Sequence, residues 1–395
     1  MTTPSDFSQR DALVHGGREL VGSGRPVNPP IEIASTILFD TLADFEAARD
    51  ARYESGNVYY GRYGTSATFH LERIMSDLEG AYGCTIVSSG VAAITMALMG
   101  SAKAGDHVLV ADHVYGNTRA FCDQVLARIG VEIEYYDPMI GAGIRDLFRP
   151  NTAAIMFESP GSGTFEFPDI PAIAGAARAK GIVTILDGTW ATPIFCRPLS
   201  LGVDVVVHSG SKYIGGHSDG MIGFIICNER TFLNTRKAAM AFGEKPGAQE
   251  VQLALRGLRT LEMRMRRVDA SGRIVASWLR EQPQVAKVLH PIFEECPGAE
   301  FWRRDFDGAA GLFGIVFKPT EEDTVRKFVD ALEMFGIGVS WGGFESLVLP
   351  VKPARTATEW SEAGPLVRFN VGFEETSTLI GDLAKALPLL DAGGN

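Results

Sequence analysis

Short apolar runs rich in β-branched residues recur through the middle of the chain and alternate with stretches of helical pattern. The runs read DHVLVAD, VEIEYYD, AAIMFES, IVTILDG, VDVVVHS and MIGFIIC. Between them, stretches such as FCDQVLARIG and PAIAGAARAKG place apolar residues on one face and end at glycine, as helices do. Strands separated by helices predict a largely parallel sheet. We therefore expect a doubly wound α/β domain over residues 66–258.

The pattern changes at both ends of the chain. Residues 1–65 are rich in Gly, Pro, Tyr and Arg with poor periodicity, which predicts an extended arm that contacts a neighbouring subunit. After the basic, heptad-like stretch RGLRTLEMRMRRVDASGRIVASWLR come two strand patterns, GLFGIVFK and LVRFNVGF, and a helix pattern, TVRKFVDALEMF. They predict a smaller α+β C-terminal domain over residues 259–395. We place the boundary near residue 258, along one long helix.

Composition narrows the class of protein. The 395 residues, 46% of them hydrophobic, suffice for two domains with a core each. The net charge is 37 − 48 = −11 with no long basic patch, which argues against a nucleic-acid or anionic-membrane surface. No segment reaches the roughly 18 uninterrupted apolar residues of a membrane span, and the N-terminus lacks the apolar stretch of a signal peptide. The five cysteines are far apart with no CxxC pair, so we expect reduced thiols, no metal site and a cytoplasmic location.

The strongest candidate for chemistry is VVVHSGSKYIGGHSDG, an apolar strand that ends in a cluster of Ser, Gly and Lys. Ligands bind at such strand ends in α/β sheets. Lys212 follows Ser209 and Ser211 directly in the sequence. This position suits an amine that forms a Schiff base beside a phosphate group, because such an amine needs a partly desolvated, fixed position. A solvated lysine in a turn would fit the same motif taken alone.

Two further segments complement this lysine. IVTILDGTWATP ends a buried strand at Asp187, and a carboxylate facing a pyridinium nitrogen keeps it protonated so that the ring accepts electrons. In CTIVSSGVAAITMALMG, Ser88, Ser89 and Gly90 open a helix whose free amides suit a phosphate. Either segment alone could be a simple helix cap. Together on one sheet, the lysine, the aspartate and the helix start predict a pyridoxal-phosphate site.

A rival motif is GHSDG at residues 216–220, which matches the G-x-S-x-G elbow of serine hydrolases with Ser218 as nucleophile. That elbow requires a strand, a turn and then a helix. Here the apolar run MIGFIIC follows and predicts a strand. A serine hydrolase acting through Ser218 is therefore kept only as the alternative from another class. The chain also lacks a complete dinucleotide fingerprint and the Gly-Lys pair of a P-loop.

With these residues identified, the chain resembles the Cys/Met-metabolism family of pyridoxal-phosphate enzymes from VNPPIEIASTILFD to LVRFNVGFEE, which is nearly its whole length. Six motifs are most similar to the bacterial cystathionine β-lyase branch and occur in this order: YGRYGT, ESPGS, SKYIGGHSD, RGLRTL, FWRRDF and SWGGFESL. The γ-lyase and synthase branches usually have ESP-x-NP and lack the tryptophan of SWGG. The resemblance implies the fold-type I architecture, with a mostly parallel seven-stranded sheet in the large domain, and a homotetramer whose active sites lie between subunits.

The resemblance also implies a role for each residue of the site. Lys212 would bind pyridoxal 5′-phosphate as a Schiff base, Asp187 would pair with its ring nitrogen, and Tyr115 would stack on the ring and assist proton transfer. The residues implied to hold the phosphate are Gly90, Val91, Ser209 and Ser211, together with Tyr60 and Arg62 from the neighbouring subunit.

For the substrate, the resemblance implies that Arg368 binds the α-carboxylate in a bidentate fork, with Ser340 and Trp341 beside it. Taken one at a time, these residues have plainer interpretations. Arg368 could be a surface strand residue, Tyr115 a half-buried core tyrosine, and Trp341 a packing residue.

The implied reaction is β-elimination of L-cystathionine to homocysteine, pyruvate and ammonia, a carbon–sulfur lyase step of methionine biosynthesis. A γ-lyase or a cysteine desulfhydrase with the same cofactor is the alternative within the family. Three positions depart from the family pattern: Gly188 replaces an Asn, Val339 replaces a Tyr of the β-lyase branch, and Met240 replaces a tyrosine. They bear on substrate preference, since the lysine, the aspartate and the arginine are all present.

Overall fold

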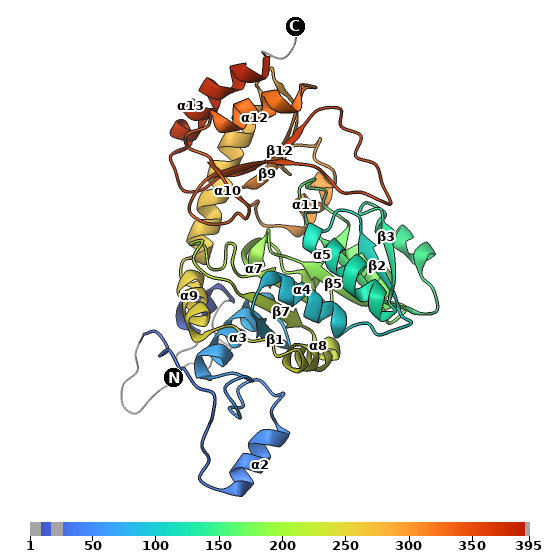
Figure 1. Cartoon of the computed structure of the whole chain (residues 1–395), viewed down its shortest axis with the longest axis vertical. Coiled ribbons are helices and arrows are strands. Elements are labelled where there is room, and N and C mark those ends of the chain that lie inside the picture. Colours follow the sequence, from blue (N-terminus) through green and yellow to red (C-terminus); the bar gives the residue numbers. More distant parts are fainter. Residues whose placement is uncertain (1–8, 17–26, 392–395) are drawn as a thin grey trace.

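The chain folds around two β-sheets, described by a computed structural model over residues 9–16 and 27–391. Figure 1 shows the larger sheet in the middle of the molecule and the smaller one above it, beneath α12 (Glu322–Asp330) and α13 (Thr376–Ala386). Helix α10 (Leu261–Arg280) runs upward beside both regions (Figure 1).

The larger sheet has seven strands in the order β1-β7-β6-β5-β4-β2-β3. Its strands are β1 (Gly83–Val87), β2 (His107–Ala111), β3 (Glu132–Tyr136), β4 (Thr152–Glu158), β5 (Val183–Asp187), β6 (Val205–Ser209) and β7 (Gly223–Cys227). β7 runs antiparallel to both neighbours and the other pairings are parallel. The six predicted strand runs and the mostly parallel seven-stranded sheet are confirmed. Strand β1 was hidden in the segment interpreted as a helix start.

Helices cover both faces of this sheet. They are α3 (Ser66–Glu79), α4 (Gly90–Met99), α5 (Gly116–Phe121), α6 (Ile170–Arg178), α7 (Thr192–Phe195), α8 (Glu229–Ala241) and α9 (Ala248–Leu258). Helix α4 is apolar on nearly all sides because it is buried against β6 and β7. The predicted helix in FCDQVLARIG is instead a π-helical turn, η3 (Cys122–Leu126), followed by a 3₁₀ turn, η4 (Ala127–Ile129).

The smaller sheet has the order β10-β11-β12-β9-β8. Its strands are β8 (Val285–Leu289), β9 (Leu312–Phe317), β10 (Gly336–Ile337), β11 (Leu347–Val351) and β12 (Leu366–Asn370), and α11 (Ala299–Asp305) and η7 (Leu387–Asp391) complete this part. β9, β12 and α12 confirm the predicted patterns. The stretch predicted as one long helix is two, α9 and α10, separated by Arg259 and Thr260. The boundary near residue 258 stays a prediction.

The N-terminal residues behave in two ways. η2 (Gln9–Asp11) and α1 (Ala12–His15) pack on α3, with Leu13 buried. Helix α2 (Leu42–Asp50) and the chain around it project from the body (Figure 1). In this projecting part, Ile33 is 89% and Leu38 90% exposed. Apolar side chains this exposed are typical of a surface that another chain covers.

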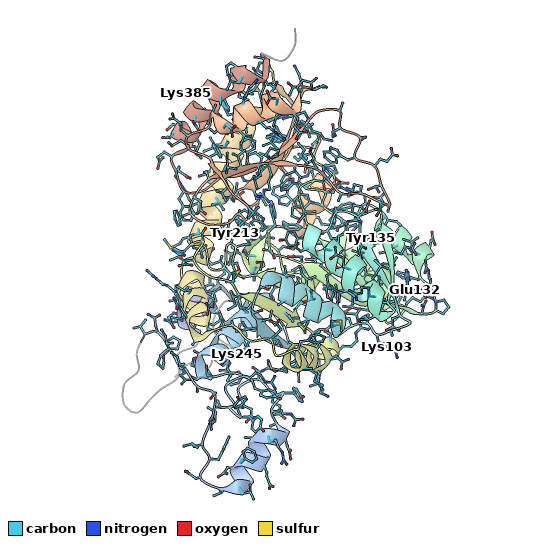
Figure 2. All side chains as sticks on the ribbon, in the orientation of Figure 1. Lys103, Glu132, Tyr135, Tyr213, Lys245 and Lys385 are labelled. Carbon is cyan, nitrogen blue, oxygen red and sulfur yellow. The ribbon has the colours of Figure 1, made fainter. Side chains whose placement is uncertain are left out.

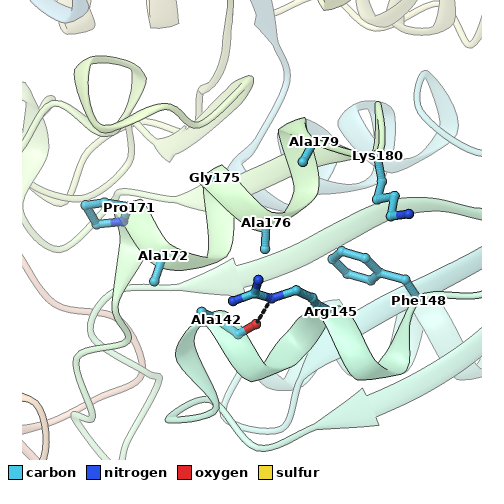
Figure 3. Close-up of a pocket in the computed structure, with 9 residues that line it drawn as sticks. All are labelled: Ala142, Arg145, Phe148, Pro171, Ala172, Gly175, Ala176, Ala179 and Lys180. Atoms are coloured by element: carbon cyan, nitrogen blue, oxygen red, sulfur yellow. Dashed lines mark hydrogen bonds between the residues drawn. The ribbon is translucent and has the colours of Figure 1, made fainter.

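A shallow hollow of about 320 Å³ lies between η5 (Gly141–Leu147) and α6, with Arg145 and Lys180 beside small apolar residues (Figure 3). Its lining contains none of the predicted site residues.

All five cysteines are buried and unpaired. Within the described ranges, no helix is long and apolar enough to cross a membrane.

Candidate active site

The site begins where three parallel strands end side by side. β4, β5 and β6 are neighbours, with Glu158 opposite Asp187 and Asp187 opposite Val207. Because the carboxyl ends of parallel strands lie at the same edge of the sheet, Glu158, Asp187 and Ser209 meet there. Lys212 follows β6 by three residues, in a turn closed by the bond from its backbone N–H to the Ser209 carbonyl, 3.2 Å.

The Lys212 amine is held from the other sheet. Its Nζ donates to Ser340 Oγ at 2.5 Å and lies 5.6 Å from the ring centre of Trp341. Burial lowers the pKa of Lys212, the positive charge of Arg368 lowers it further, and Asp187 acts in the opposite direction. An amine with a lowered pKa is uncharged more of the time, and only the uncharged form is a nucleophile or a base.

Ser340 connects this lysine to Arg368. While its hydroxyl accepts from Lys212, its carbonyl accepts from Arg368 Nη2 at 3.1 Å. Ser340 has φ +90°, and Gly342 has φ +80° and packs on the lysine turn, where a Cβ would lie 2.9 Å from the backbone nitrogen of Tyr213. Figure 2 shows Tyr213 at mid-height in the molecule, between the regions of the two sheets. The structure thus brings the predicted substrate residues to the predicted cofactor lysine.

Asp187 is fixed by its own loop. Its Oδ1 accepts from the Thr189 backbone N–H at 2.9 Å and from Thr189 Oγ1 at 2.5 Å, and Thr189 Oγ1 in turn accepts from the Ser209 N–H at 2.9 Å. Burial raises the pKa of Asp187, while the Thr189 bonds, His208 and Lys212 favour its anionic form. An oriented carboxylate of this kind suits a protonated ring nitrogen.

Glu158 was missed in the sequence. It is 4% exposed, and its two oxygens accept from the backbone N–H groups of Tyr115, at 2.5 Å, and Ser162, at 3.1 Å. Burial and the adjacent Asp187 charge raise its pKa to about 8. Glu158 therefore takes the proton of the pair and leaves the negative charge on Asp187. The signal was present, because AAIMFES ends at a carboxylate as IVTILDG does.

Tyr115 lies at the start of α5 and its side chain is 42% exposed, so it is not a core tyrosine. Its hydroxyl accepts from Asn117 Nδ2 at 2.7 Å. It also lies near enough to Arg368 to oppose the lowering of that guanidinium's pKa by burial. Tyr115 is therefore placed between the Glu158 strand end and the residues of the smaller sheet.

The predicted phosphate residues surround the start of α4. Ser89 caps this helix by accepting from the Ala92 N–H at 3.1 Å. A Cβ on Gly90 would lie 2.5 Å from the Cβ of Ser209, so the helix start and the end of β6 are in contact. Val91 follows Gly90 in the first turn, and Ser211 Oγ accepts from the Ile222 N–H at 3.2 Å. Amides, hydroxyls and a positive helix end suit a phosphate.

Tyr60 and Arg62 are not brought to this group. Arg62 donates to the carbonyl of Met240, at 2.5 Å, and lies over the ring of Tyr63. The other polar partner of Arg62 is the hydroxyl of Tyr63, at 3.1 Å. Their role in a neighbouring subunit stays a prediction.

Ser218 does not form a hydrolase site. It lies in a turn that leads to strand β7, where the nucleophile elbow requires a helix. Its hydroxyl donates to Glu345 Oε1 at 2.6 Å. Neighbouring His217 bonds to the Gly215 carbonyl through Nδ1 instead.

The residues at this edge fit pyridoxal phosphate. A partly buried amine, an oriented carboxylate beside a neutral one, and a glycine-opened helix start match the aldehyde, the ring nitrogen and the phosphate of that molecule. The Gly90 position supports this match, because a side chain there would collide with Ser209 and cover the amides.

Comparisons with known proteins agree with this chemistry. The family model described as Cys/Met metabolism PLP-dependent enzyme matches residues 11–388. A cystathionine β-lyase of Haemophilus influenzae is 39% identical over 97% of this chain and 98% of its own. An L-alanine/L-glutamate racemase of Wolbachia pipientis wMel is 36% identical over 97% and 98%.

A solved structure extends the comparison to the fold. The metB structure of Corynebacterium glutamicum superposes with a TM-score of 0.88 at 28% identity, covering 98% of this chain and 99% of that one. The match to the family model covers nearly the whole chain and includes every residue of the site described above. The chain belongs to the Cys/Met metabolism family of pyridoxal-phosphate-dependent enzymes.

Proposed function

We propose that the chain is a carbon–sulfur lyase that cleaves the Cβ–S bond of L-cystathionine. The observation that carries the proposal is the Lys212 amine held by Ser340 between a carboxylate edge, at Asp187, and the guanidinium of Arg368. An amino acid entering this site meets a cation for its carboxylate and a base for its Cα proton. The similarity to the Haemophilus influenzae cystathionine β-lyase and the ESPGS and SWGGFESL motifs support the choice of substrate.

Each side chain has a task in this reaction. When bound, pyridoxal phosphate supplies an electron sink for the carbon that loses its proton. Lys212 would hold the cofactor aldehyde and, once displaced by the substrate amine, take the Cα proton on Nζ. Ser340 keeps that nitrogen in place through its hydroxyl. Arg368 would bind the substrate carboxylate in a bidentate fork.

The remaining groups hold the cofactor. Asp187 would bind the protonated ring nitrogen, with Glu158 neutral beside it, and Tyr115 would cover the ring. The residues that would hold the phosphate are Gly90, Val91, Ser209 and Ser211, together with Tyr60 and Arg62 of a second copy of the chain. We propose a homotetramer on this basis, because the exposed projecting arm needs a partner to cover it.

The atoms balance with one water. The Cα–H bond breaks and its proton moves to Lys212, then the Cβ–S bond breaks and the sulfur leaves as homocysteine after gaining a proton. The three-carbon enamine that remains is hydrolysed to pyruvate and ammonia.

We propose a cytoplasmic location, supported by the five unpaired cysteines, because proteins of oxidising compartments commonly pair theirs.

The test uses purified, cofactor-loaded protein with L-cystathionine as the only substrate. We expect pyruvate and homocysteine in equal amounts. Mainly 2-oxobutyrate and cysteine would show a γ-lyase instead. No turnover of cystathionine together with release of sulfide from cysteine would overturn the choice of substrate, and racemisation of L-alanine instead would overturn the lyase proposal; both would leave the cofactor assignment intact.

Two variants control the class of chemistry. Lys212→Ala should abolish pyruvate release, and borohydride reduction of the wild type should attach the cofactor to Lys212. Ser218→Ala should keep most of the activity, because the Ser218 hydroxyl donates to Glu345 and has no assigned role toward the cofactor or the substrate. Loss of all activity in correctly folded Ser218→Ala would contradict the proposal and restore the hydrolase alternative.

A further inference from the structure

The face of the larger sheet that lies opposite the Asp187 side chain holds a buried pair of residues, His208 and Glu79. Side chains alternate between faces along a strand, and β5 and β6 pair with Asp187 opposite Val207. Asp187 and Ser209 therefore lie on one face, while Gly188 and His208 belong to the other. His208 is almost completely buried, and so is its partner Glu79 at the end of α3.

His208 packs directly beneath the residue after Asp187. A Cβ added to Gly188 would lie 3.0 Å from Cε1 of His208 and 3.1 Å from Cγ1 of Val206, closer than side chains normally pack. The Gly188 N–H continues the ladder by donating to the Val207 carbonyl at 3.0 Å. The glycine that departs from the family pattern is thus matched to the histidine, whose ring occupies the space that a larger residue would need.

Glu79 is the hydrogen-bond partner of this histidine. The Nε2 of His208 lies 2.7 Å from Glu79 Oε1, and this contact connects residues 129 positions apart in the sequence. Glu79 is the last residue of α3, at the negative end of the helix dipole, where a cation is favourable. Within the described residues, Glu79 Oε2 and His208 Nδ1 are buried without a hydrogen-bond partner, so the contact between Nε2 and Oε1 is what compensates the burial of both side chains.

Two neighbouring groups lie within reach of the pair. Burial and then Glu79 raise the pKa of Cys196, which keeps that thiol neutral. His208 favours the anionic form of Asp187. The histidine of the pair is therefore the member that acts on Asp187.

We propose that His208, charged by its contact with Glu79, is a positioning residue that keeps the proton shared by Asp187 and the cofactor ring on the ring nitrogen. A positive charge packed against the residue after Asp187 would lower the proton affinity of that carboxylate, so that a proton shared with a bound ring would stay on the ring nitrogen. Removing the charge moves the shared proton toward the Asp187 oxygen. This inference rests on the proposed role of Asp187.

The experiment measures the ring nitrogen directly. Wild type, His208→Gln and Glu79→Gln are loaded with pyridoxal phosphate labelled with ¹⁵N in the ring and compared by NMR. We expect a protonated nitrogen in the wild type and a shift toward the unprotonated signal in both variants. The kcat with L-cystathionine should fall by about tenfold, the equivalent of one pKa unit, with KM nearly unchanged. Because the two residues act as one unit, the double variant should match either single variant.

His290→Gln is the matched control. His290 is also fully buried, but burial lowers its pKa to about 3 and it packs among aromatic rings of the smaller sheet, so its loss should leave the ring-nitrogen signal unchanged. A wild-type nitrogen without a proton would overturn the role of Asp187. A protonated wild-type nitrogen that neither His208→Gln nor Glu79→Gln moves would overturn this inference alone.

A measurement on the unaltered protein guards against variants that fail to fold. With ¹⁵N-labelled histidine, the wild type should show His208 with protons on both Nδ1 and Nε2 near neutral pH. A neutral His208 ring would also overturn the proposal.

Discussion

Glu158 and Asp187 end neighbouring strands, yet their surroundings give them opposite protonation states. Asp187 accepts hydrogen bonds from the hydroxyl and the amide of Thr189 and lies near Lys212. Glu158 is buried and accepts from the backbone N–H groups of Tyr115 and Ser162, and its pKa is nevertheless raised. Two adjacent buried carboxylates cannot both ionise at low cost. The proton on Glu158 is therefore part of what makes Asp187 available to the cofactor.

This proton makes stability depend on pH. Burial raises the pKa of Glu158 from 4.5 to about 8, so between these values the folded chain holds a proton that the unfolded chain has released. Folding stability from this group is then lost as pH rises through the window, by up to about 1.4 kcal/mol per pH unit. In Glu158→Gln this contribution disappears. Urea unfolding of cofactor-free protein from pH 5 to 8 should show a steeper fall for the wild type.

A control separates this effect from a general response to pH. Glu300→Gln, which removes an exposed carboxylate of α11, should follow the wild-type curve. Parallel curves for the wild type and Glu158→Gln over the whole window would show that Glu158 is ionised in the folded chain.

Among the elements, the segment between β11 and β12 is tied to the larger sheet by one buried carboxylate. Asp112, just after β2, accepts from the backbone N–H groups of Thr356 and Thr358 at 2.8–3.0 Å and from Arg119 at 2.6 Å. Burial alone would raise the pKa of Asp112, but these bonds lower it to about 2. Because β12 carries Arg368, this tie helps to hold the proposed substrate arginine near the end of the larger sheet that carries Lys212 and Asp187.

Asp112→Asn should loosen this tie. The amide cannot accept all of these bonds and places its own NH₂ against donors, so we expect a loss of about 2–4 kcal/mol in the free energy of unfolding. Hydrogen exchange should rise at residues 355–358. The wild type should lose the same contribution in acid, as pH falls from 3.8 through about 2, whereas the variant should not.

Asp323→Asn provides the comparison, since Asp323 forms an exposed ion pair with Lys327 within α12. Its effect should stay below about 1 kcal/mol. Equal losses for Asp323→Asn and Asp112→Asn would mean that the buried bonds add nothing to stability.

Periodicity predicted the elements that are long or fully buried and missed those shaped by their neighbours. The central strands carry continuous apolar runs because helices cover both faces of the sheet. β10 has two residues and β11 ends in Pro350 and Val351, so neither shows a clear pattern. The π-helical turn at η3 keeps helix-like spacing, which explains why FCDQVLARIG was interpreted as an ordinary helix.

The same limit applies to the site. Lys212, Asp187 and the Ser-Gly helix start could be predicted because each lies at the end of a recognisable strand. The contact between Lys212 and Ser340 spans 128 positions and that between His208 and Glu79 spans 129, and no local pattern encodes either. Arg368 and Trp341 were assigned from the family resemblance, and the fold then explained why they meet the lysine.

At the scale of the whole molecule, one chain brings together most of the proposed site but not all of it. The amine, the two carboxylates and Arg368 converge within the chain, while Arg62 donates to the Met240 carbonyl instead. A site completed by a neighbour accounts for both the exposed apolar arm and the two predicted residues that do not reach their own lysine.

Mixing inactive variants tests this arrangement. In a mixed pair of Arg62→Ala and Lys212→Ala chains, one site receives both changes and the other receives neither. Reassembly of equal amounts should therefore restore about a quarter of the wild-type activity, because half of the pairs are mixed. The readout is pyruvate release, with differently tagged chains to confirm that mixed oligomers form.

The matched control mixes chains that carry Lys212→Ala with chains that carry Arg368→Ala. Both residues contact Ser340 in the same chain, so no arrangement of subunits rebuilds a complete site and activity should stay absent. Mixed oligomers of Arg62→Ala and Lys212→Ala that remain inactive would show that Arg62 serves its own chain.

Because the cofactor edge belongs to one sheet and the loop from Ser340 to Trp341 and strand β12 belong to the other, the two can diverge separately during evolution. Substitutions in the smaller sheet that spare Ser340 and Gly342 can select a new amino acid without disturbing Lys212 or Asp187. Relatives of similar identity that carry the names of a lyase and of a racemase are the outcome expected from such a division. Libraries that seek a new substrate are best confined to residues 338–346 with Ser340 and Gly342 kept unchanged, because Ser340 holds the Lys212 amine and Gly342 packs on the lysine turn.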